Sequence, residues 1–124
     1  MAILRFPDQD VCRKTVDAIR EKLQVHGNPA FVYRYLRKDD FGHPQSSFLI
    51  CSFWLVQALV KTGRAEEARA VMSAAMGASN TLGLLAEHFV PANVQQLGNF
   101  PQAYSHVGQI NAAFAVSPPW DDVI

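Results

Sequence analysis

The chain has 124 residues, of which 49% are hydrophobic and 18% charged, and its 11 basic and 11 acidic residues give a formal net charge of zero. This length suits one domain, residues 1–124, and the balanced charge argues against nucleic-acid or anionic-membrane partners. The sequence contains neither an apolar run long enough to span a bilayer nor the apolar core of a signal peptide, so we expect no membrane partner and a cytoplasmic location.

The first expected element is a helix that begins after Asp8, whose side chain can cap its N-terminus. Its apolar residues recur at a four-three-four spacing, at Cys12, Val16, Ile19 and Leu23. Charged residues fill the other positions, so this helix is predicted to lie on an outer surface and to end near Gly27-Asn28-Pro29. We expect extended chain over residues 31–35 and a turn-rich loop over residues 39–47.

Two further helices are expected in the middle of the chain. Residues 47–62 are apolar on nearly every side, which is typical of a helix buried all round, and Gly63 follows as a C-terminal cap. Residues 65–76 form an amphipathic pattern whose inward positions are Ala68, Val71, Met72, Ala75 and Met76. Two cysteines are too few for a disulfide framework, and both lie in apolar helical stripes, so we expect reduced, buried thiols at Cys12 and Cys51.

A fourth helix is expected to begin at Asn99, with Gln102 completing a capping box and Pro101 in the first turn. Its apolar stripe repeats the four-three-four spacing, at Ala103, Val107, Ile110 and Phe114. Pro118 and Pro119 end it. The alternation of amphipathic and fully apolar helices predicts an all-α domain of about four helices in two outer/inner hairpins.

Three segments carry a resemblance to a known family. In the first, a carboxylate, Glu87, follows the apolar run Gly83-Leu84-Leu85-Ala86 and precedes a polar loop. The second is the apolar helix that contains residues Phe48 to Leu59. The third lies upstream and reads Val32-Tyr33-Arg34-Tyr35. Together these segments resemble glycoside hydrolase family 15, the glucoamylases and their glucodextranase- and trehalase-like relatives. The resemblance runs from about residue 7 to residue 116 and covers only the C-terminal part of the family's much longer catalytic domain.

The resemblance implies part of an (α/α)6 toroid and an inverting hydrolysis of an α-glucoside or oligosaccharide. It implies that Glu87 is the general base, although spacing alone favours a solvated glutamate. Arg34 and Tyr35 are implied as substrate contacts, with a surface arginine and an inward-packed ring as alternatives. Tyr104 and His106, near the start of the fourth helix, are expected to reach sugar hydroxyls or to pack there. No cofactor is implied, and the histidines lack metal-ligand spacing.

The family's general acid lies upstream of the segment that this chain resembles. We therefore expect a truncated piece that is inactive alone and that needs the N-terminal part of the catalytic domain or self-association. The apolar second helix supports this, since each large apolar side chain left exposed forgoes about 1.5–3 kcal/mol of burial. The alternative is a noncatalytic helical interaction module, oligomeric or not, derived from the same family.

Overall fold

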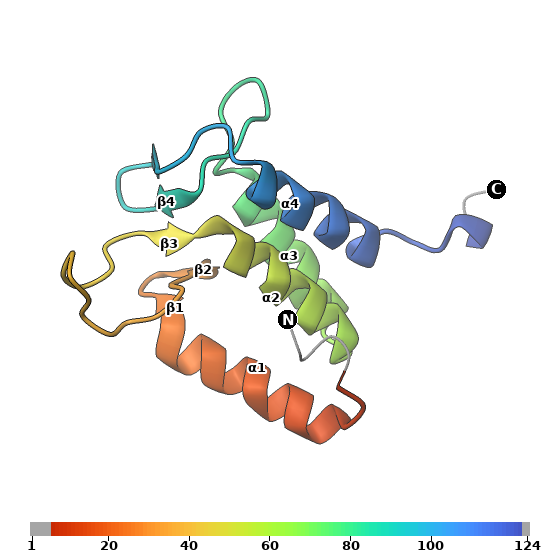
Figure 1. The fold of residues 1–124 in the computed structure, drawn as a ribbon. Coiled ribbons are helices and arrows are strands. Elements are labelled where there is room, and N and C mark those ends of the chain that lie inside the picture. Colours follow the sequence, from red (N-terminus) through yellow and green to blue (C-terminus); the bar gives the residue numbers. More distant parts are fainter. Residues whose placement is uncertain (1–5, 123–124) are drawn as a thin grey trace.

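The computed structural model describes residues 6–122 of the chain (Figure 1). Within them the elements follow in this order: α1 (Gln9–Leu23), β1 (Gln24–Val25), β2 (Asn28–Val32), β3 (Ser47–Phe48), α2 (Leu49–Lys61), α3 (Ala65–Met76), β4 (His88–Val90), β5 (Gln95–Leu97), α4 (Ala103–Val116) and a 3-10 turn, η2 (Trp120–Asp122). The described part is mostly helical and contains the four expected helices. The prediction of an all-α domain is wrong in one respect, because the structure also contains two small β-sheets.

β2 overlaps the extended chain predicted over residues 31–35, and the other strands lie in stretches predicted as helix or loop. β1 and β2 form an antiparallel hairpin, and Gly27 at its turn has a φ of 73°, which glycine adopts without strain. β3, β4 and β5 form an antiparallel sheet in which Ser47 lies opposite Phe89. The buried Ser47 hydroxyl donates to the Phe89 carbonyl at 2.7 Å, so Ser47 belongs to the sheet and α2 begins only at Leu49.

The core is built around α2, which packs against α3 and α4 (Figure 1). Leu49, Phe53 and Leu59 are fully buried on it. The prediction that this helix is covered on all sides is wrong for one strip, because Cys51 and Trp54 are only partly buried. The predicted stop is confirmed: Gly63, with a φ of 80°, follows the last residues of the helix.

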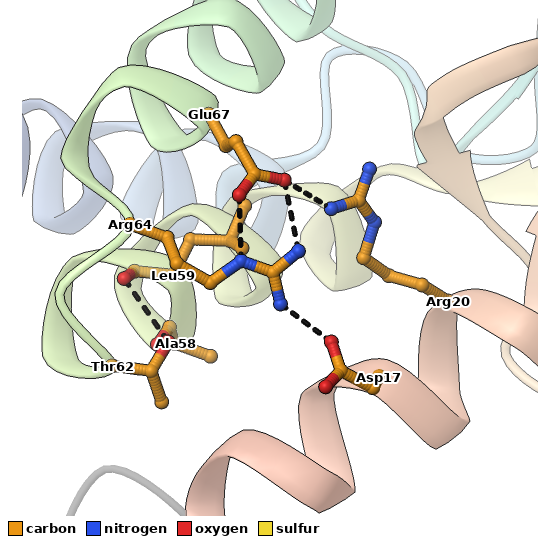
Figure 2. Close-up of polar contacts among 7 residues, drawn as sticks. All are labelled: Asp17, Arg20, Ala58, Leu59, Thr62, Arg64 and Glu67. Carbon is orange, nitrogen blue, oxygen red and sulfur yellow. Dashed lines mark hydrogen bonds and ion pairs between the residues drawn. The ribbon is translucent and has the colours of Figure 1, made fainter.

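α1 lies at the edge of this core, as its pattern predicted. Asp8 caps it, since its side chain accepts hydrogen bonds from two backbone N–H groups of the first turn. On the side facing the α2–α3 turn, the guanidinium of Arg64 contacts Asp17 at 2.6 Å and Glu67 at 2.7 Å, and Arg20 also pairs with Glu67 (Figure 2). Hydrogen bonds from Arg64 and Arg20 lower the pKa of Glu67 to about 2.

α4 differs from its prediction in both its start and its orientation. It begins at Ala103 after Gln102, with no side-chain cap, so the capping role predicted for Asn99 is wrong. Its buried positions are small: Ser105, Gly108 and Ala112. A Cβ on Gly108 would lie only 2.4 Å from Ile50 Cδ1, so α4 approaches α2 through this glycine.

The apolar four-three-four stripe of this helix faces solvent. Val107, Ile110 and Phe114 are 52%, 53% and 63% exposed, and Ala103 is exposed as well. Periodicity identified the stripe correctly but not its direction, because α4 also has an apolar small-residue face. Close backbone approach, rather than side-chain size, selects the face that packs on α2.

Candidate functional site

The backbone that leads to Glu87 is bound to the first turn of α4. The Leu85 N–H donates to His106 Nε2 at 3.2 Å, and the Leu85 carbonyl accepts from the Gln102 N–H at 2.8 Å. The buried hydroxyl of Ser105 donates to the Ala86 carbonyl at 2.8 Å. Leu85 and Ala86 are themselves fully buried, so α4 fixes the position of the peptide that precedes the glutamate.

Glu87 itself bridges the start of α2 and the loop before α4. Its N–H donates to the Asn99 carbonyl at 2.9 Å, and its carbonyl accepts from the Leu49 N–H at 3.1 Å. Its carboxylate Oε2 accepts from the Asn99 N–H at 3.2 Å, whereas Oε1 accepts no hydrogen bond from the described residues. The side chain is partly exposed, so one carboxylate oxygen is held and the other has no hydrogen-bond partner among residues 6–122.

The loop glycine Gly98 makes room for this carboxylate. Its φ is 78°, and a Cβ built there would lie 2.8 Å from Glu87 Oε2 and 3.0 Å from Glu87 Cβ. A residue with a side chain would therefore push directly against the glutamate. Nothing in the local pattern around Gly98 identifies this role, because the contact joins residues eleven positions apart.

A pocket of about 330 Å³ opens beside this sheet, within the range typical of small-ligand sites. Its lining combines the loop before β3 with the start of β4: Arg34, Tyr35, Asp39, Phe41, Gly42, His43, Pro44, Gln45, Ser46 and His88. The Tyr35 hydroxyl donates to the Asp39 carboxylate. This hydrogen bond raises the pKa of Tyr35 and, together with the Phe41 N–H, lowers the pKa of Asp39.

A stack of side chains connects this pocket to the strand that follows Glu87. The Arg34 guanidinium lies 5.5 Å from the centre of the Phe48 ring, and the Phe48 and His88 rings are 5.1 Å apart. Ser46 Oγ lies 3.2 Å from His88 Nδ1. The β3–β4 register pairs Phe48 with His88, so the sheet brings Arg34 toward the segment that carries Glu87.

The structure thus separates the four predicted substrate-contact residues into two groups. Arg34 and Tyr35 share the pocket, whereas Tyr104 and His106 lie on the first turn of α4. Tyr104 is 48% exposed and meets Trp54 edge to face, with ring centres 5.8 Å apart. Both ring nitrogens of His106 have protein neighbours, the Leu85 N–H at Nε2 and Gln109 Oε1 at Nδ1. These contacts orient the backbone before Glu87.

Sequence reasoning missed Ser46 and Ser105. Each contacts a residue far away in the chain: Ser46 contacts His88, and Ser105 donates to the Ala86 carbonyl. No group of three His, Cys, Asp or Glu side chains suited to a metal ion occurs in residues 6–122. The described helices include none with the length and apolar character needed to cross a membrane.

Comparisons with known proteins give one consistent likeness. The chain is 39% identical to a trehalase of Mycobacterium tuberculosis over 119 residues, 94% of this chain and 17% of the relative. It is 38% identical to a trehalase of Mycolicibacterium smegmatis over 110 residues, and 35% identical to one of Thermoplasma volcanium over 100 residues, each covering 16% of the relative. The chain therefore spans about one sixth of the length of these relatives. Searches found no matching family model and no matching solved structure.

Proposed function

We propose that this chain forms part of the catalytic domain of a trehalase-type glycoside hydrolase and that Glu87 is its general base. The observation that carries the proposal is the fixed geometry of Glu87, with Oε2 bound to the Asn99 N–H and Oε1 available. The 39% identity to a trehalase over 94% of this chain supports the same assignment. Family 15 chemistry and a place in an (α/α)6 toroid belong to this proposal.

The reaction is an inverting hydrolysis of an α-glucoside such as trehalose. Glu87 Oε1 takes a proton from water, whose oxygen attacks the anomeric carbon from the face opposite the leaving group. The bond between that carbon and the glycosidic oxygen breaks, and a carboxylic acid from another segment protonates the leaving oxygen. Carboxyl groups that work in this way lie about 6.5–9.5 Å apart, which leaves room for the water.

The pocket beside β3 and β4 supplies the substrate contacts in this proposal. Arg34 and the Tyr35–Asp39 pair present donors and acceptors to sugar hydroxyls. Asp39 does not suit the general acid, because an acid in this reaction needs a raised pKa, whereas the Tyr35 hydrogen bond lowers that of Asp39. In this proposal the acid comes from outside this chain, and the isolated chain is expected to be inactive.

A chimeric enzyme tests this function. The region of the M. tuberculosis trehalase that matches this chain is replaced by the chain itself, and glucose release from trehalose and maltose is measured. Glu87→Gln, which keeps the size of the side chain, is expected to lower kcat by about 100- to 10,000-fold. Glu66→Gln, on the exposed face of α3, serves as the matched control and should leave kcat unchanged. Full activity of the Glu87→Gln chimera would refute the assignment.

The alternative, a noncatalytic helical interaction module, draws support from one observation: the apolar face of α4 is exposed. The same chimera separates the two functions. A module would give a chimera without hydrolytic activity, whatever residue occupies position 87, whereas the proposed enzyme requires a glutamate there.

A further inference from the structure

The outward face of α4 has the composition of a buried surface. Ala103, Val107, Ile110 and Phe114 lie on the side opposite the buried Ser105, Gly108 and Ala112, and we call these four residues the outer stripe. All 14 residues of the helix are uncharged by sequence, with neither Asp, Glu, Lys nor Arg. A helix that is apolar on opposite faces is typical of the interior of a larger protein rather than of a surface.

The outer stripe begins in the first turn of α4, the turn whose opposite face holds the peptide before Glu87. Ala103, its first residue, is separated by two positions from Ser105, which binds the Ala86 carbonyl. Phe100, 51% exposed, and Tyr104, 48% exposed, lie at the same end of α4. Whatever covers the outer stripe therefore packs on the side of α4 opposite Ser105, and α4 itself links it to the peptide that positions Glu87.

A second copy of this chain is a poor occupant on grounds of area. A helix of 14 residues is about 21 Å long and about 10 Å wide, so pairing through the outer stripe would bury roughly 200 Å² of each copy. Stable protein interfaces bury about 800 Å² of each partner. In contrast, the matched trehalases have several times the length of this chain, and the outer stripe lies in a helix within the region of similarity.

From these observations we infer that the outer stripe of α4 docks an apolar helix of the polypeptide that completes the catalytic domain and supplies its general acid. The inference rests on the proposed function and names the surface through which the acid is delivered. Docking on α4 sets the position of the acid relative to Glu87, because the same helix holds the backbone of Leu85 and Ala86.

The test uses charge variants in the isolated chain and in the trehalase chimera. Ile110→Lys places a charge in the outer stripe, and Asn111→Lys places the same charge on the adjacent exposed, polar position. In the isolated chain, sedimentation should give a monomer, and both variants should shift Tm by less than about 4 °C, since neither side chain packs on the core. In the chimera, Ile110→Lys should abolish the folded, soluble protein or its cooperative unfolding, while Asn111→Lys should preserve both.

A cysteine variant provides a second readout that needs no charge to be buried. The thiol introduced by Val107→Cys should react with a maleimide at least tenfold more slowly in the chimera than in the isolated chain. Equal rates would overturn the inference, as would a dimer of the isolated chain that Ile110→Lys dissociates. Failure of the chimera to fold when it contains the chain without any substitution would also overturn the inference.

The same samples keep the two proposals apart. Protection of the Val107→Cys thiol in a folded chimera that releases no glucose would support docking and refute the proposed function. Glucose release by a chimera whose Val107→Cys thiol stays fully reactive would refute docking and support the proposed function.

Discussion

The Ser105 hydroxyl donates a 2.8 Å hydrogen bond to the Ala86 carbonyl, and both residues are almost completely buried. This contact links two segments 19 residues apart and places the first turn of α4 directly against the peptide before Glu87. The position of the glutamate therefore depends on the packing of α4 as well as on its own strand.

Ser105→Ala is expected to lower the free energy of unfolding by about 1–3 kcal/mol, because it leaves the buried Ala86 carbonyl without its donor. Urea denaturation of the isolated chain measures this. Ser117→Ala is the matched control: its hydroxyl also donates to a carbonyl at 2.8 Å, that of Ala113, but Ser117 is exposed. A change below about 0.5 kcal/mol is expected for it. Equal effects of the two variants would contradict the role of burial.

Gly98→Ala is expected to displace the Glu87 carboxylate. Gly83→Ala is the control, because Gly83 has nearly the same φ, 77°, yet its Cβ would meet nothing within 4 Å. Both variants should lose about 1–2 kcal/mol of stability from the left-handed backbone. Only Gly98→Ala should also lower kcat in the chimera, by up to about 100-fold, since small misplacements of reacting groups are costly. Equal kcat values for the two variants would rule out the steric role of Gly98.

Gly108→Ala should destabilise the chain by about 1–3 kcal/mol, since the added methyl overlaps Ile50 Cδ1 on α2. This is opposite in sign to the gain of about 1 kcal/mol expected for the same change at an exposed helical site. Thermal unfolding measures the effect. Shortening the neighbour with Ile50→Val in the double variant should recover part of the loss; independent, additive effects would show that α2 and α4 do not meet at Gly108.

The ion pairs of Glu67 with Arg64 and Arg20 predict a defined pH dependence. Its folded pKa, about 2, lies below its ordinary value of 4.5, so its stabilisation is present above about pH 4.5 and is lost as the pH falls toward 2. The Glu67 side chain is 45% exposed, so solvent screening limits the effect to roughly 1 kcal/mol. Urea unfolding of the native chain and Glu67→Gln should differ by this amount at pH 7 and converge near pH 2. A difference that persists at pH 2 would contradict this assignment.

Cys51 is expected to react slowly with alkylating reagents. Burial raises the pKa of its thiol to about 11 from 9.0, so the thiolate fraction at pH 8 falls by roughly 100-fold relative to an unperturbed cysteine. Iodoacetamide labelling followed by peptide mass spectrometry measures the rate, with the urea-unfolded chain as reference. The rate should rise with pH up to about 11; a plateau near pH 9 would refute the shift.

The sequence alone determined the elements whose signals are local. Residues 65–76 were predicted as a helix with its inward face, and α3 has these bounds, because an amphipathic pattern depends only on neighbouring turns. Asp8 was predicted as an N-cap and is one, since capping involves the next three residues.

Tertiary structure decided what depends on distant partners. The pattern of α4 contains two apolar faces, and only the close approach of Gly108 to Ile50 determines which one is buried. The pairing of Phe48 with His88, which brings Arg34 toward the strand after Glu87, joins residues 40 positions apart in the chain. Periodicity identifies which residues share a face of an element, but the element that covers this face is selected by packing across the whole chain.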